Sequence, residues 1–365
     1  MAWRSAASHL GCVRSSHALL VIAIVQGVLL AAFFILIVLN RWFRVRRRAR
    51  VGPLRSACDA TLKRWAAGAE STATVVAALE RLPVPALLDC LAAWADLVPP
   101  ALWTELSHAL ERRWWAQLVR TNTKSARWWK RLESARLLAL VPTPADVPRV
   151  RQLLADPHPA VHLVVVGALE RLHDASLALA ALRRVPELPR TAQAYYASRL
   201  RSSRPLIVEQ LRRMLSDAAN PQLAGLAEFA GQLRDPALRD AFLKLVSHEE
   251  AEVRAQAARG LGTYPHPDSS AALRRLASDP SWPVRALAMQ GLGRFAQAEN
   301  LPQVRTGMRD PEWWVRVRAG LALTRFGPAG RAALADEERG PHADARGVAQ
   351  LVLGLSGDAL REYLT

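Results

Sequence analysis

One short pattern returns along this chain at a spacing of 31 residues. The segments "SHEEAEVRAQAARGLGTY" (247–264), "SDPSWPVRALAMQGLGRF" (278–295) and "RDPEWWVRVRAGLALTRF" (309–326) follow one another at this interval. Residues 125–141 and 155–172 align with them. The aligned positions are Lys130, Val161, Val253, Val284 and Val315, separated by 31, 92, 31 and 31 residues, and 92 is close to three times 31. A fixed period of this size predicts an array of structural repeats, in which each unit packs on its neighbours.

Each repeat is predicted to be a pair of helices joined by a short turn. In the second helix, apolar and small residues recur at four-residue steps, as in Val284, Ala288 and Leu292, which places them on one helical face. Asp-Pro precedes this helix at 279–280, where the aspartate caps free N–H groups and the proline ends the preceding helix. A shorter amphipathic run at 270–278 forms the first helix. The predicted fold is all-α.

The pattern resembles the HEAT-repeat family, specifically the bacterial subset with the sequence "DPxxxVRxxAxxxL", and the chain is similar to a membrane-anchored member of it. The resemblance is strongest over 265–326 and weakest over 174–235 and 331–355. It implies an armadillo-type α-solenoid over 125–358, but no particular activity, because HEAT arrays serve unrelated roles. It also implies that the arginine after the aligned position pairs with the turn aspartate of an adjoining unit, at Arg131, Arg254, Arg285 and Arg316.

Large aromatic residues stand at the start of several second helices. Trp128, Trp282 and Trp313 each lie two residues before the aligned position. An apolar side chain there can hold the turn against the helix that it precedes, so we expect a packing role.

An uncharged apolar run at 18–39 predicts a single transmembrane helix, since about 20 apolar residues cross a bilayer. Arginines are more frequent after this run than before it, which places residues 1–17 outside and the repeats in the cytoplasm of a bacterial inner membrane. The linker at 40–52 is then expected to contact anionic lipid. Its contact residues would be Arg41, Trp42, Arg44, Arg46, Arg47, Arg48 and Arg50.

The net charge of +17 is concentrated in two segments. Residues 1–64 hold eleven bases and one acid, and residues 112–131 hold seven bases and no acid. The rest of the chain holds 31 bases and 31 acids, so its net charge is zero. We therefore do not expect a nucleic-acid partner.

The region at 53–124 lacks the repeat signature but shows helical apolar spacing. We expect four helices near 53–67, 71–82, 84–96 and 99–119. The region is either a divergent cap and spacer, as terminal repeats often are, or a separate helical domain.

One basic and aromatic segment, "RRWWAQLVRTNTKSARWWKR" (112–131), is a candidate contact patch. It would meet an acidic protein surface, lipid headgroups or a nucleic-acid backbone, or it is only two helix ends joined by a turn. Adjacent helix positions diverge, so Trp114 and Trp115 cannot both be buried. The patch residues are Arg112, Arg113, Trp114, Trp115, Arg120, Lys124, Arg127, Trp129 and Lys130.

The sequence contains no recognisable catalytic motif, and we expect no enzyme activity, metal or cofactor. The pair His248-Glu249 stands alone, although a di-iron site would need several such pairs. His158 and His162 are separated by a turn, and Cys12, Cys58 and Cys90 have no metal-binding spacing.

The predicted function is a membrane-anchored scaffold that presents a cytosolic solenoid to a protein partner, with other membrane proteins among the candidates. The alternative is a nucleic-acid-binding or nucleic-acid-modifying protein on a HEAT-like scaffold.

Overall fold

The computed structural model describes residues 26–28, 30–36, 38–39, 41–42 and 51–364, with side chains as far as residue 360. All regular secondary structure within these residues is helical. The chain divides into two compact units, Met1–Ala116 (unit 1) and Gln117–Thr365 (unit 2).

Unit 1 is a set of short helices around a small apolar core. A helix over 51–66 is followed by α2 (Thr72–Leu79), α3 (Val84–Trp94) and α4 (Pro100–Glu111). The predicted single helix at 99–119 is wrong, because the helix breaks at 112–113 and α5 (Trp114–Thr121) begins after the break. Leu62, Leu79 and Leu106 are fully buried between these helices.

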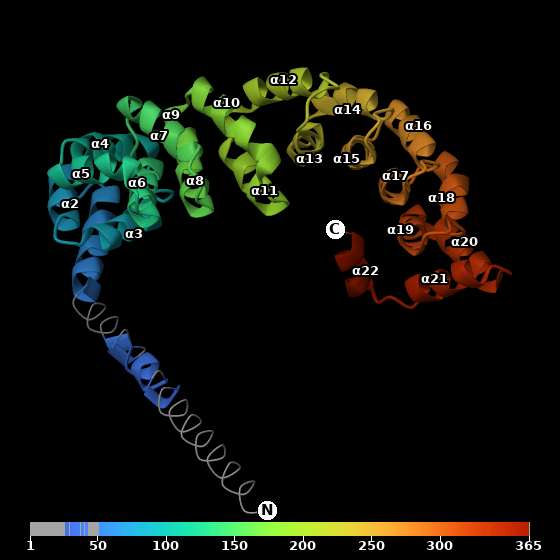
Figure 1. The fold of residues 1–365 in the computed structure, drawn as a ribbon, viewed down its shortest axis with the longest axis horizontal. Coiled ribbons are helices and arrows are strands. Elements are labelled where there is room, and N and C mark those ends of the chain that lie inside the picture. Colours follow the sequence, from blue (N-terminus) through green and yellow to red (C-terminus); the bar gives the residue numbers. More distant parts are fainter. Residues whose placement is uncertain (1–25, 29, 37, 40, 43–50, 365) are drawn as a thin grey trace, which may run out of the picture. The chain divides into compact units, whose positions relative to one another are not determined.

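Unit 2 consists of two rows of helices, and Figure 1 shows that the rows follow an arc with one row on its concave side. The convex row contains α7 (Val147–Leu154), α10 (Ala175–Arg184), α12 (Arg204–Leu215), α14 (Arg239–Leu245), α16 (Pro267–Leu276), α18 (Leu301–Gly307) and α20 (Gly327–Arg339). The concave row contains α6 (Trp128–Leu140), α8 (Pro159–Val165), α11 (Arg190–Arg199), α13 (Leu223–Leu233), α15 (Ala251–Leu261), α17 (Trp282–Phe295), α19 (Trp313–Leu323) and α21 (Ala343–Leu353). The short helices α9 (Leu169–Leu172) and α22 (Gly357–Leu364) complete the unit.

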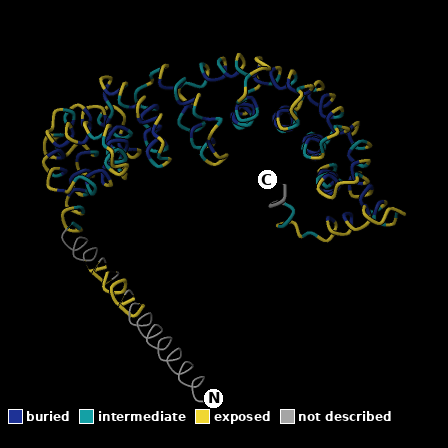
Figure 2. Tube along the Cα trace, viewed as in Figure 1, coloured by how far each residue is buried: buried dark blue, intermediate teal, exposed yellow. Residues whose placement is uncertain are grey.

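The predicted repeat of helix, turn and helix is confirmed, and it forms an α-solenoid. Val284, Ala288 and Leu292 are completely buried on one face of α17, as their spacing predicts. Figure 2 shows that such buried positions recur along the rows of unit 2. At Gly293 the neighbouring helix approaches so closely that an added Cβ would lie 2.7 Å from the Cα of Ala322. Small residues therefore set the spacing between consecutive concave helices.

The predicted transmembrane helix at 18–39 and the inner-membrane location that depends on it are wrong. In the part of the chain that the structure describes, no helix has both the length and the apolar character needed to cross a membrane. A span needs about 20 apolar residues, or roughly 30 Å of helix. Residues 1–17 and 18–25, with the basic residues Arg44, Arg46, Arg47, Arg48 and Arg50, lie outside the described residues.

Candidate functional site

The arginine after the aligned position binds the turn aspartate of the next repeat, which confirms the predicted ladder. Each carboxylate accepts hydrogen bonds from two guanidinium nitrogens, and the shortest separations are 2.6–2.7 Å. The pairs are Arg131–Asp156, Arg254–Asp279 and Arg285–Asp310. Arg316 differs, because its nearest carboxylate, that of exposed Asp344, lies 3.8 Å away. The ladder connects repeats and is not a ligand site.

The tryptophans at the start of the second helices pack only in part. Trp128, Trp282 and Trp313 are the first residues of α6, α17 and α19, and each remains 41–45% exposed. Trp128 stacks on the ring of His158, with centroids 4.1 Å apart. Each of these side chains is therefore partly covered and partly exposed to solvent.

The predicted contact patch extends over both units, and its residues differ in exposure. In unit 1, Arg112, Arg113 and Trp114 are exposed, whereas Trp115 is buried. This confirms that the two adjacent tryptophans diverge. In unit 2, Lys124, Arg127 and Trp129 are exposed, Lys130 is half-buried, and Arg120 is buried.

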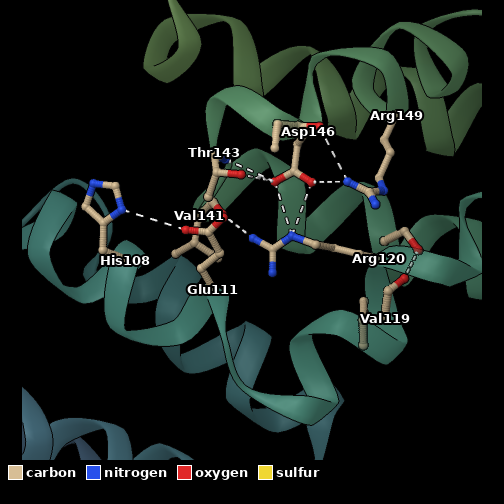
Figure 3. A network of polar contacts seen from close by, with 10 residues as sticks. His108, Glu111, Val119, Arg120, Val141, Thr143, Asp146 and Arg149 are labelled. Carbon is tan, nitrogen blue, oxygen red and sulfur yellow. Dashed lines mark hydrogen bonds and ion pairs between the residues drawn. The ribbon is translucent and has the colours of Figure 1, made fainter.

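Buried Arg120 stabilises the first repeat of unit 2. Figure 3 shows its guanidinium pointing at the carboxylate of Asp146, to which Nε donates at 3.1–3.2 Å. Arg120 also donates to the carbonyl of Val141 at 3.1 Å, and Asp146 accepts from Thr143 at 3.0 Å. A guanidinium held in this way serves packing and is not accessible to a partner.

The histidines singled out in the sequence are parts of local packing. His162 is buried and lies 3.2 Å from the hydroxyl of Tyr196, and burial lowers the pKa of its imidazole. The imidazole of His248 contacts the carbonyl of Ala218 in the preceding repeat and accepts a hydrogen bond from the N–H of Glu250 in its own turn. Among the described residues, no group of three histidine, cysteine or acidic side chains is placed to hold a metal ion.

A hollow of about 770 Å³ lies on the concave side of unit 2, and we call it the arginine hollow. It is formed by five consecutive concave helices, from α11 to α19, and by the residues that follow them. Five arginines and one glutamate line it, together with threonine, glutamine and small apolar side chains. The charged residues are Arg190, Arg234, Arg259, Arg294, Arg318 and Glu228.

Most of the positive charge in the arginine hollow has no counter-charge. Glu228 faces two of the arginines, Arg259 at 3.4 Å and Arg190 at 3.9 Å. Within the described chain, the side chains of Arg234, Arg294 and Arg318 form neither a hydrogen bond nor an ion pair. Guanidinium groups have five N–H donors and remain charged at any physiological pH, so these three are available to an anion.

Burial and mutual repulsion act on these arginines together. Burial lowers the pKa of Arg294, and the neighbouring guanidinium groups of Arg325, Arg234 and Arg318 lower it further. The pKa of Arg259 is lowered in the same way by burial and by Arg190. Both residues lie in the last turn of their helices, α17 and α15, where the negative end of the helix dipole favours a cation. The helix ends offset part of the repulsion, and a bound anion would relieve the rest.

The charge totals of the sequence do not identify the arginine hollow, but the alignment of the repeats contains one indication of it. Arg294 and Arg325 occupy the same position in successive repeats, ten residues after the aligned valines Val284 and Val315. If this repeat position lies on the concave side of the array, the two arginines lie close to each other. The sequence alone does not show on which side of the array the position lies.

Comparison with known proteins assigns the family. A sequence model of HEAT repeats matches residues 205–283 and 273–354, which include the helices that form most of the arginine hollow. Residues 205–354 are HEAT repeats. No curated protein matches its sequence.

Solved structures of karyopherins resemble the chain weakly. Kap121p bound to the extreme C-terminus of the protein phosphatase Cdc14p gives a TM-score of 0.42 at 15% identity, covering 77% of this chain and 39% of that one. A Kap121p mutant gives 0.46 at 13% identity, covering 80% and 40%. Kap121p bound to the SUMO protease Ulp1p gives 0.42 at 15% identity, covering 77% and 38%. The chain spans about two fifths of these proteins' length, and nothing about its own partners follows from them.

Proposed function

We propose that this HEAT-repeat protein is a non-catalytic scaffold that binds a segment of a partner protein on the concave side of unit 2. The observation that carries the proposal is the arginine hollow, which takes its lining from five consecutive concave helices. A stack of helix pairs presents an extended concave surface, and such surfaces suit a bound segment of chain.

The chemistry of the lining agrees with binding rather than catalysis. General acid–base and nucleophilic catalysis need an activated nucleophile or a base within hydrogen-bond reach of the reacting group. The hollow offers guanidinium groups, amides and hydroxyls, and its single carboxylate, on Glu228, is directed toward two arginines. These groups provide charge and hydrogen bonds to hold a ligand.

The test is to compare the proteins captured by the full-length chain with those captured by two charge-reversal variants. Arg294→Glu with Arg318→Glu changes the arginine hollow. Arg212→Glu with Arg213→Glu makes the same charge change on the convex helix α12, where both side chains are exposed. We expect a stoichiometric partner that is lost only with the hollow variant, provided that circular dichroism shows equal helicity. If every captured protein survives the hollow variant, the proposal is wrong.

We propose the exposed residues Lys124, Arg127 and Trp129 of unit 2 as a second contact. The guanidinium of Arg127 lies over the ring of Trp129, 5.7 Å from its centroid, and both side chains remain exposed. A cation–π pair of this kind presents a flat surface of charge and apolar area to a partner. Replacing all three residues by alanine should weaken capture of the partner, and an unchanged set of partners would contradict this contact.

A further inference from the structure

We infer that the arginine hollow recognises a run of aspartate and glutamate side chains on the partner protein. The inference rests on the proposed function and specifies its ligand. Three guanidinium groups, those of Arg234, Arg294 and Arg318, face the hollow without an acidic partner among the described residues. Three guanidinium groups carry three positive charges, so a segment with several carboxylates neutralises them more completely than a single carboxylate does.

The hollow already contains one example of the proposed interaction. Glu228 presents its carboxylate to Arg259 and Arg190, and the glutamate belongs to the protein itself. A guanidinium matches a carboxylate with two parallel N–H donors, which is the geometry that makes these pairs strong and directional. The carboxylates of an acidic segment would extend this pairing to the three arginines that Glu228 does not reach.

The uncharged groups of the hollow favour a peptide over a polynucleotide. The side-chain oxygen of Gln232 is buried and accepts no hydrogen bond, although its nitrogen donates to Gln193 at 3.1 Å. A peptide backbone supplies an N–H donor to the oxygens of the lining at nearly every residue, whereas a phosphodiester backbone supplies none. Thr191, Thr263 and Gln290 add further donors and acceptors beside it.

The hollow also lacks the features that single-stranded nucleic acid requires. Proteins that bind such strands stack successive bases on aromatic rings along a basic groove. None of the described residues that line the arginine hollow is aromatic. Its volume, about 770 Å³, is that of a site for a short segment and not of a long groove.

Glu228 makes the inference testable by a gain of binding as well as by a loss. Its carboxylate competes with an acidic ligand for Arg259 and Arg190, and it repels the ligand's own carboxylates. Glu228→Gln removes the charge and keeps the shape, so affinity for an acidic peptide should rise several-fold. Misfolding cannot produce such an increase.

The experiment measures fluorescence anisotropy of a short labelled poly-glutamate peptide titrated with the full-length protein. We expect Arg294→Gln with Arg318→Gln to weaken binding about tenfold to a hundredfold, because hydrogen bonds to charged groups are lost. The control, Arg212→Gln with Arg213→Gln, removes the same charge from α12 and should leave the affinity unchanged.

Four outcomes would overturn the inference. Poly-glutamate could bind the parent protein and Arg294→Gln with Arg318→Gln with equal affinity. Glu228→Gln could also fail to strengthen poly-glutamate binding. A poly-thymidine oligonucleotide could bind more tightly than poly-glutamate and depend on Arg294 and Arg318, which would assign the hollow to nucleic acid. If poly-glutamate does not bind but a captured partner still depends on the hollow, the ligand class is wrong and the scaffold function stands.

Discussion

Asp310 joins two successive HEAT repeats, and replacing it by alanine measures what the Arg–Asp ladder contributes to stability. Its carboxylate accepts hydrogen bonds from Nε and Nη2 of Arg285 at 2.7 and 2.8 Å, and from the backbone N–H of Glu312 at 2.9 Å. The two side chains of the pair are only 14% and 11% exposed. Asp310→Ala therefore leaves a largely buried guanidinium without its counter-charge.

The expected cost in the free energy of unfolding is about 2–3 kcal/mol. Removing one partner of a fully buried ion pair costs about 3–5 kcal/mol, because the other charge stays buried and unpaired. The cost is smaller here, since Arg285 keeps its hydrogen bonds to the carbonyls of Asp279 and Pro280, at 2.9 and 3.1 Å. The double variant Arg285→Ala with Asp310→Ala should cost less than the sum of the two single changes.

Urea unfolding followed by circular dichroism gives the free energies, and an exposed ion pair serves as the control. Glu209 pairs with Arg212 and Arg213 on the surface of α12, where all three side chains are 49–70% exposed. Glu209→Ala should cost roughly 0.5 kcal/mol or less, as exposed pairs do. If Asp310→Ala costs no more than Glu209→Ala, the ladder does not stabilise the array and the reasoning fails.

The same variant has a predictable pH dependence. Burial raises the pKa of Asp310, but the hydrogen bonds from Arg285 and from the backbone outweigh it and hold the pKa below its ordinary value of 3.8. A carboxyl whose pKa is lower in the folded state stabilises the fold above the unfolded-state pKa and loses this effect as pH falls through the folded-state pKa. The difference in stability between the parent protein and Asp310→Ala should therefore be constant near neutral pH and shrink below about pH 4.

Further predictions concern individual backbone and packing positions. Arg234 and Ala296 have left-handed backbone conformations, with φ of 50° and 48°. Replacing either residue by glycine should raise the free energy of unfolding by about 1 kcal/mol. Only Arg234→Gly should also weaken poly-glutamate binding. Gly293→Val should lower the free energy of unfolding by about 2 kcal/mol or more, because the backbone of α19 leaves no room for a side chain. The thiols of Cys58 and Cys90 are buried with their sulfurs 3.6 Å apart, so Ellman's reagent should modify them only as unfolding by urea proceeds.

The repeat architecture could be predicted from the sequence because its causes are local and periodic. Val284, Ala288 and Leu292 recur every four residues, and their burial follows from helix geometry alone. The ladder was also predictable, since Arg285 and Asp310 hold fixed places in adjoining units. The predicted membrane helix came from hydropathy over 18–39, and the described residues contain no helix that supports it.

The arginine hollow could not be predicted by counting charges. Outside residues 1–64 and 112–131 the chain holds as many acids as bases, and a sum over the chain does not record which face each side chain occupies. Arg259 and Arg318 lie in different repeats, and only the packing of α15, α17 and α19 brings both to one concavity. For the same reason, the sequence did not show that Arg120, which was assigned to the contact patch at 112–131, is buried against Asp146.

The Arg–Asp ladder and the arginine hollow both follow from where the acidic side chains of the repeats lie. Asp279 and Asp310 are bound in turns by Arg254 and Arg285, and Glu337 on the convex helix α20 is bound by two further arginines. Acidic side chains that are bound in these ion pairs cannot neutralise the concave side. Among the described residues that line the hollow, Glu228 is the one that is acidic. The concave side of the array therefore carries a local excess of positive charge. It follows that substitutions in the ladder should change stability without changing ligand affinity, whereas Glu228→Gln should do the reverse.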